Sequence, residues 1–415
     1  MSIGIAIGIW IARYLGPESF GILSYSLSVV SIFSVIATLG LDGILVRELV
    51  KCPTRANELL FTSVTLKIVA SLTILLVTYL TLYIFVQDKQ VSMLIMIISI
   101  STIFQSLNVF ELFFQSIVEM KYVFFSNAIS MLVSSCVKIF LLMNGGELVD
   151  FAWVAVLEIF IIFITVFIFF IWYAKSTLNN ALRAKFNINI AKELLKDSWP
   201  LLFSGMVISL YMKIDQIMIN GLLGSKDVGL YAAAVWLSEA IYFLPMAIVV
   251  SVYPLLIRSK EIGEKYYLEK LQILYDTLVW LAILISLIIT FSSDFLITNL
   301  YGPSYSDASD VLKIHVWSSI FVFVGIAYSR FLMIENLKMK ALYRTLLGLI
   351  INISFNFILI PLYGINGAAV ATLLSQLGSN YLYDLFDKNL RYQFYMKIGS
   401  FNPRNLYKQI WSILK

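Results

Sequence analysis

The chain has 415 residues, of which 60% are hydrophobic and only 13% are charged, and its mean hydropathy is +0.88. A soluble domain carries roughly 25% charged residues, so this chain has too few charges to cover a surface that faces water. The composition therefore excludes an ordinary soluble protein. The two cysteines, Cys52 and Cys136, lie far apart in the sequence, which argues against a disulfide framework or a zinc site.

Apolar stretches of about 20 residues recur from end to end, and each is long enough to cross a hydrocarbon core of ~30 Å as a helix. Helices are expected because every backbone N–H and C=O group in lipid must be bonded internally. We predict an all-α integral membrane protein with about twelve spans, at residues 1–12, 20–39, 59–86, 91–117, 122–143, 151–173, 199–219, 228–257, 271–300, 311–334, 341–362 and 365–386.

The first of these spans is too short. Twelve residues at about 1.5 Å each reach roughly 18 Å, which does not cross the hydrocarbon core. We therefore expect the true start of this helix to lie upstream of Met1, so that residues 1–12 supply only part of it.

Basic residues are distributed unequally when the N-terminus is placed in the cytoplasm and the sides alternate. Most of the 30 Lys and Arg residues then fall in cytoplasmic loops and in the tail. Only Arg13, Lys89 and Lys226 fall on the opposite side. Because positive charge accumulates on the cytoplasmic side, both termini are predicted to be cytoplasmic.

Two prolines, Pro245 and Pro254, lie well inside one predicted span. Proline within a helix frees backbone carbonyl groups and kinks the helix. The span is expected either to carry a fixed kink that aids packing or to bend during a transport cycle.

A short motif occurs twice, about half the chain apart: LGPESFGI at residues 15–22 and LGSKDVGL at residues 223–230. Both copies join two spans on the predicted outer side. The repetition predicts two halves of like orientation, and transporters built from such repeats bind their substrate between the halves. The expected division is a six-helix bundle at 1–173, a cytoplasmic linker at 174–198, a second six-helix bundle at 199–386 and a basic cytoplasmic tail at 387–415.

Several motifs resemble those of one family of membrane proteins. ARYLGPESFG at residues 12–21, LGLD at 39–42 and VREL at 46–49 resemble the start of Wzx-type polysaccharide flippases. LYGPSY at 300–305 with VLKI at 311–314, and YGINGA at 363–368, are similar to later helix junctions of that family. The resemblance covers nearly the whole chain, and the first motif is the most specific.

The resemblance implies both a fold and an activity. The family belongs with the MATE-like transporters and the peptidoglycan-precursor flippases in the MOP superfamily, which implies two six-helix bundles around a central cavity. It implies transfer of undecaprenyl-diphosphate-linked oligosaccharide, typically an O-antigen repeat unit, from the cytoplasmic to the periplasmic leaflet of the bacterial inner membrane. The partners it implies are this lipid-linked cargo, membrane lipids and the O-antigen polymerase and chain-length machinery.

Ionisable residues inside the spans are costly, so they are expected to face a cavity or one another. Lys67 and Glu111 lie on neighbouring spans near the inner side, and Lys138 and Glu158 lie near the outer side. Each pair is predicted either to form an ion pair between helices or to contact substrate.

The remaining charges supply the candidate site. The cavity candidates for binding the cargo are Arg330, Lys213, Lys67 and Lys313. Arg330 is chosen because guanidinium binds phosphate through two hydrogen bonds, although it can equally be an anchor at the inner end of its span. Asp215 and Glu239 are the ion-coupling candidates. Lys213 and Asp215 are two residues apart and cannot share a helix face.

The single histidine and three aromatic residues are further residues of interest in the spans. His315 is expected to be packed or interfacial rather than part of a proton relay. Tyr211, Trp236 and Tyr328 are aromatic candidates for stacking on sugar rings.

Other functions are kept open. A MATE-like antiporter for cationic drugs would need a mainly acidic cavity, which the balance of charges in the spans does not favour. A flippase for another lipid-linked glycan, of the capsule or of peptidoglycan, fits the same motifs. No HExxH, Walker A or GxSxG motif occurs, so we expect no enzyme activity, no cofactor, no metal and no nucleic-acid partner.

Overall fold

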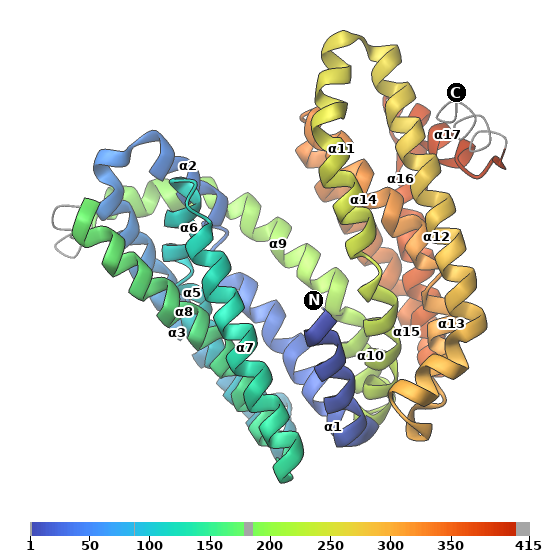
Figure 1. The fold of residues 1–415 in the computed structure, drawn as a ribbon, viewed down its shortest axis with the longest axis horizontal. Coiled ribbons are helices and arrows are strands. Elements are labelled where there is room, and N and C mark those ends of the chain that lie inside the picture. The colour runs from blue at the N-terminus through green and yellow to red at the C-terminus, as the bar shows by residue number, and fades with distance from the viewer. Residues whose placement is uncertain (1, 87, 178–185, 404–415) are drawn as a thin grey trace. The chain divides into compact units, whose positions relative to one another are not determined.

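The computed structural model describes residues 2–86, 88–177 and 186–403, and within these ranges the chain is helical, with no strand (Figure 1). Clustering of backbone contacts divides it into two compact units. Unit 1 comprises residues 1–15 and 22–213, and unit 2 comprises residues 16–21 and 214–415. Two helices, α1 (Ser2–Ala37) and α9 (Ile188–Leu222), contribute residues to both units.

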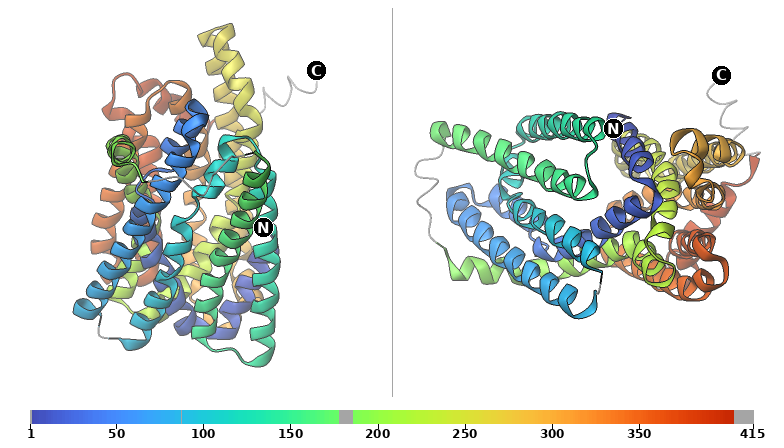
Figure 2. Two further views of the ribbon diagram at one scale, coloured as in Figure 1. Left: turned by 90° about the vertical axis from the view of Figure 1, so that its left-hand side faces the viewer. Right: turned by 90° about the horizontal axis from the view of Figure 1, so that it is seen from below.

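Unit 1 contains the remaining helices of the N-terminal half. They are α2 (Asp42–Lys51), α3 (Ala56–Phe85), α4 (Lys89–Ser99), α5 (Ser101–Ser106), α6 (Val109–Ser116), α7 (Lys121–Asn144) and α8 (Leu148–Thr177), with a 3₁₀ turn at Pro53–Arg55. Helices α7 and α8 form an antiparallel hairpin, as the views in Figures 1 and 2 show. Two clusters of buried apolar side chains, one around Leu45 and Phe113 and one around Leu94 and Phe151, form the cores of this unit.

Unit 2 contains the helices of the C-terminal half. They are α10 (Ser225–Ala240), α11 (Phe243–Ile262), α12 (Glu264–Leu300), α13 (Ala308–His315), α14 (Ser318–Ile334), α15 (Lys338–Leu377), α16 (Tyr383–Phe386) and α17 (Arg391–Gly399), with a 3₁₀ turn at Pro303–Tyr305 and a π-helical turn, η4, at Gly378–Leu382. Its core is one cluster of buried side chains centred on Tyr275, Val279 and Phe323, from α12 and α14. The part of the predicted linker at 178–185 and the tail at 404–415 lie outside the described residues.

The chain is a multi-pass membrane protein. Among the described residues, nine helical segments are long and apolar enough to cross a membrane, or ten if the bent pair α13 and α14 is one span. Two segments, Gly4–Lys51 and Lys338–Phe386, each cover two of the predicted spans. Each contains a glycine with non-helical angles, Gly16 or Gly364, near the predicted division. The count of twelve spans and the placement of both termini stay predictions.

The span predicted at residues 228–257 is interrupted. Helix α10 ends at Ala240, and α11 begins at Phe243. The break puts Pro245 in the first turn of α11, where its missing N–H group costs little, whereas Pro254 stays inside the helix. Of the two prolines expected to kink the span, Pro245 therefore lies at the junction between two helices, and only Pro254 lies inside a helix.

The two copies of the repeated motif pack directly against each other within unit 2. A Cβ atom added to Gly21 would lie 1.7 Å from the carbonyl oxygen of Ser225, and one added to Gly229 would lie 1.9 Å from that of Pro17. The contact is reciprocal, because Pro17 and Ser225 hold the same position in the two copies, as do Gly21 and Gly229. Small residues allow such close approach of backbones in membrane helices.

We predict that Gly229→Ala destabilises the protein, because the new methyl group would push two backbones apart. The cost expected from such overpacking is about 1–3 kcal/mol. Thermal unfolding of the purified protein in detergent measures it. The matched control is Gly221→Ala on α9, where an added Cβ meets no atom within 4 Å. That variant should be unchanged or more stable, since alanine favours helix by about 1 kcal/mol over glycine. Equal effects of the two substitutions would contradict the close contact.

Candidate functional site

A buried carboxylate organises the polar interior of unit 2. Asp215 on α9 is 8% exposed. Its Oδ2 accepts hydrogen bonds from the hydroxyl groups of Tyr231 (2.8 Å) and Thr372 (2.5 Å), and its Oδ1 accepts one from the amide of Asn356 (2.6 Å). Asn356 and Thr372 lie on opposite sides of the break at Gly364 in α15. All three of these donors are neutral groups.

Further oxygen atoms surround this carboxylate. The Asn356 amide nitrogen also donates to Oδ1 of Asn352 (3.1 Å), whereas the buried Oδ1 of Asn356 has no hydrogen-bond partner. An unused buried acceptor costs about 1–3 kcal/mol. We call these five residues (Asp215, Tyr231, Asn352, Asn356 and Thr372) the Asp215 site. Its carboxylate, amide and hydroxyl oxygens can hold a single positive charge, as a proton or a small cation.

The second ion-coupling candidate, Glu239, lies near the same cluster. It is half-buried near the end of α10 and within electrostatic range of Tyr231. The preceding residue, Ser238, hydrogen bonds to Nδ1 of His315 at 2.8 Å. His315 is buried and stands edge-on to the ring of Tyr231, which confirms the expectation of a packed histidine.

Two of the four cargo candidates have no carboxylate partner among the described residues. Lys213 is half-buried on α9, and the boundary between the units falls directly after it, so Asp215 belongs to the other unit. Arg330 is half-buried on α14, where its guanidinium lies 5.4 Å from the ring centre of Tyr253 and contacts the sulfur of Met333 at 3.6 Å. Within the described ranges, neither cation is therefore neutralised by an acid.

The other lysines in the predicted spans are neutralised. Lys313 pairs with Asp294 and Asp310, each at 3.0 Å. Lys138 pairs with Glu158 at 2.8 Å, which confirms the predicted pair between α7 and α8.

The predicted pairing of Lys67 with Glu111 is wrong. The Lys67 ammonium group is fully buried and donates instead to Asp42 (2.6 Å) and to the side-chain oxygen of Asn108 (2.7 Å). Asp42 belongs to the LGLD motif, which the sequence prediction had placed outside the spans. It reaches Lys67 because α2 begins at Asp42, directly after the turn at Leu39–Gly40. Glu111 lines a neighbouring cavity of about 200 Å³ with Gln105, Asn108 and Asn127.

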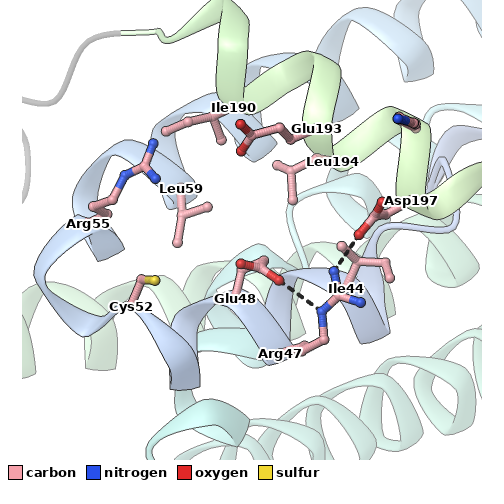
Figure 3. Close-up of a pocket in the computed structure, with 11 residues that line it drawn as sticks. Ile44, Arg47, Glu48, Cys52, Arg55, Leu59, Ile190, Glu193, Leu194 and Asp197 are labelled. Carbon is pink, nitrogen blue, oxygen red and sulfur yellow. Dashed lines mark hydrogen bonds and ion pairs between the residues drawn. The ribbon is translucent and has the colours of Figure 1, made fainter.

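A larger pocket of about 310 Å³ opens at the predicted inner end of unit 1 (Figure 3). Arg47 of the VREL motif binds Glu48 at 2.8 Å and Asp197 of α9 at 2.5 Å along its edge. Basic and acidic side chains alternate around it, so it carries no strong net charge that would favour one kind of ligand.

Sequence reasoning identified Asp215 but missed the residues that bind it. Tyr231, Asn356 and Thr372 are uncharged, and the search for ionisable side chains passed over them. One signal was present: Asn352 and Asn356 are four residues apart within an apolar span and so share a helix face. The aromatic candidate Tyr328 is fully buried and therefore not placed to stack on a sugar.

Comparisons with known proteins agree with this fold. Residues 2–260 match the family model described as polysaccharide biosynthesis protein, and residues 200–358 match the MatE model. The capsular polysaccharide biosynthesis protein CapF of Staphylococcus aureus is 26% identical over 224 residues, which are 53% of this chain and 56% of that protein. The chain spans about half the length of the curated relatives it matches.

Two groups of solved structures share the fold. The inward-facing conformation of a multidrug resistance MATE family transporter of the MOP superfamily superimposes with a TM-score of 0.70 at 15% identity, covering 92% of each chain. The lipid II flippase MurJ, in an inward closed conformation, superimposes with a TM-score of 0.66 at 16% identity, covering 96% of this chain and 91% of that one.

The family match extends over more than half of the sequence, and the helical architecture resembles that of the two solved transporters. The chain belongs to the polysaccharide biosynthesis protein family.

Proposed function

We propose that this protein is a flippase for undecaprenyl-diphosphate-linked oligosaccharide. It moves the cargo, an O-antigen repeat unit, from the cytoplasmic to the periplasmic leaflet of the bacterial inner membrane by alternating access. Membership of the polysaccharide biosynthesis protein family supports the cargo class. The proposal includes both termini in the cytoplasm, six helices in each half and functional cooperation with the O-antigen polymerase.

One structural observation supports an anionic cargo. Among the described residues, two of the candidate cations, Lys213 and Arg330, lie without a carboxylate partner, whereas Lys67, Lys138 and Lys313 are each paired. An unneutralised charge in the membrane is costly, and such residues mark substrate or ion pathways. A diphosphate headgroup would supply the missing negative charge, and guanidinium suits phosphate especially well.

The Asp215 site supports coupling to an ion. Its carboxylate accepts hydrogen bonds from neutral groups and has no basic partner among the residues that the structure describes, so a proton or a small cation can bind there and be released. In the proposed cycle, the ion bound at Asp215 favours one conformation and its loss favours the other. Glu239 is the second coupling candidate because it lies within electrostatic range of the same cluster.

Two alternatives have specific support. The MatE match and the likeness to a MATE transporter favour an antiporter for cationic compounds. The similarity to CapF favours a flippase whose lipid-linked glycan belongs to the capsule. The similarity to MurJ favours a flippase that carries a peptidoglycan precursor. A flippase-null strain expressing this chain separates these functions. The proposal expects surface O-antigen to be restored, and drug resistance without restored glycan would indicate the antiporter.

We predict that Lys213→Ala and Arg330→Ala each reduce glycan display at least about tenfold. Each removes charge-assisted hydrogen bonds to phosphate, which are worth about 1.5–3 kcal/mol. Surface glycan is measured against the amount of variant in the membrane. Lys138→Ala is the matched control, since Lys138 is already paired with Glu158 and should stay active. If both test variants display as much surface glycan as the wild type, Lys213 and Arg330 do not bind the cargo.

We predict that Asp215→Asn abolishes coupling while preserving the fold, because the amide is nearly isosteric but has lost the charge that holds an ion. Transport into vesicles should fall at least about tenfold, the loss expected when about 1.4 kcal/mol of ion binding is removed. Varying pH and sodium separately identifies the ion. Asp294→Asn, at an exposed acid of the same unit, serves as the control. Normal, still ion-dependent transport by Asp215→Asn would place coupling elsewhere.

We predict that Lys67→Met lowers thermal stability, because it leaves Asp42 and Asn108 without their buried donor. The cost should lie below the about 3–5 kcal/mol of a fully buried broken pair, since the Asp42 side chain is 44% exposed. The double variant Lys67→Met with Asp42→Asn should regain stability. If Lys67 is structural, this double variant also transports normally; a transport defect at full stability would make Lys67 a cargo contact.

A further inference from the structure

Helix α17 buries its polar face and exposes its apolar face, whereas an amphipathic helix on a water-exposed surface does the reverse. It follows the last candidate span, which ends at Phe386. Gln393 and Lys397 of α17, with Ser400 just after it, are all completely buried against unit 2. Their spacing of four and three residues places them on one face. This helix therefore turns its polar face inward.

The inward face is bonded to the rest of unit 2 at several points. Lys397 donates to Asp384 (2.6 Å) and to the carbonyl oxygen of Asn380 (2.7 Å). Its ammonium lies 3.2 Å from the ring centre of Tyr328, whose hydroxyl also donates to Asp384 at 2.5 Å. Burial lowers the pKa of Lys397 to about 7, against the opposing influence of Asp384. These bonds fix the rotation of α17 about its own axis.

Helix α12 adds a second set of bonds. The hydroxyl of Tyr275 donates to Gln393 at 3.0 Å, and the amide of Gln272 donates to the Met396 carbonyl (3.0 Å) and the Ser400 hydroxyl (2.9 Å). All three residues of the polar face are therefore bonded to other parts of unit 2, although the amide nitrogen of Gln393 has no partner among the described residues, and the opposite face points away from the unit.

That outward face is aromatic and apolar. Tyr395 is 68% exposed and Ile398 is 46% exposed, and the neighbouring Tyr392 and Phe401 are also exposed. Leaving such side chains in water forgoes about 25 cal/mol for every Å² of apolar surface that could be covered. Phe386, at the end of the last span, is exposed as well.

We infer that α17 lies in the headgroup region of the membrane, with its outward face against lipid. Tyrosine is enriched at this level of the bilayer, where its ring meets acyl chains and its hydroxyl meets water. Arg391 lies on the same face, four residues before Tyr395, and Lys388 is exposed in the turn before α17; their positive charges match the negative charge of anionic phospholipids. The apolar face of such a helix is buried about 5–10 Å into the boundary between the headgroups and the acyl chains.

Spin labels measure this depth directly, in vesicles of phosphatidylcholine and phosphatidylglycerol that contain no other protein. Cys52 and Cys136 are replaced by serine, and single cysteines are introduced as Tyr395→Cys and Ile398→Cys. Phe291→Cys, at an exposed position within α12, gives the lipid reference, and Asn389→Cys gives the water reference. Collision with oxygen reports lipid, and collision with a nickel chelate reports water.

The expected result is that labels at 395 and 398 collide more with oxygen than with nickel and report a depth of about 5–10 Å. Nickel access equal to that at 389 would place the face in water and overturn the inference. Shielding from both reagents would also overturn it, because a second copy of the chain would then cover the face. A second variant, Lys397→Met with Asp384→Asn, keeps the buried charge balanced while removing the ion pair, and should make the label at 398 more mobile.

Discussion

The cost of placing a charge in a hydrocarbon layer governs most of this structure. Each ionised side chain in a span must be paired, hydrogen bonded or hydrated. Lys67 is bonded by Asp42 and Asn108, and Lys138 is bonded by Glu158. Because nearly every charge is so occupied, the few that are not stand out. Within the described part of the chain, Lys213 and Arg330 have no carboxylate partner, and the hydrogen-bond donors to Asp215 are all neutral.

The candidate site contains two kinds of charged group, basic residues for an anionic cargo and an acid for a small cation. Basic side chains without acids suit an anionic headgroup, and an acid without bases suits a small positive charge. Lys213 and Asp215 are two residues apart on α9, yet they belong to different compact units. One helix therefore carries a candidate for each role, and the opposite directions of their side chains follow from the helical repeat.

Much of the fold was predictable because membrane helices obey a simple rule of length and hydropathy. The points at which helices are interrupted were harder to predict from the sequence. The division of α1 was visible from the motif containing Gly16, whereas the junction between α10 and α11 carries no glycine and appeared only as proline within a span.

Pairing was predictable only where depth in the membrane was clear. Lys138 and Glu158 lie at matching depths in adjacent spans, so their ion pair could be inferred. Asp42 was assigned to a loop, so its bond to Lys67 was missed. The Asp215 site joins residues from α9, α10 and α15, and contacts between such distant segments follow from tertiary packing that no local pattern encodes.

The contact between Gly21 and Gly229 resembles an interface between two copies of one protein. Position 17 meets 229 and position 225 meets 21, so each copy of the motif presents the same patch to the other. This is the isologous geometry of a symmetric homodimer, in which one self-complementary surface suffices for association. The chain therefore forms, between two of its own segments, the kind of contact that a homodimer forms between two copies, so a larger side chain at either glycine would disrupt the same contact.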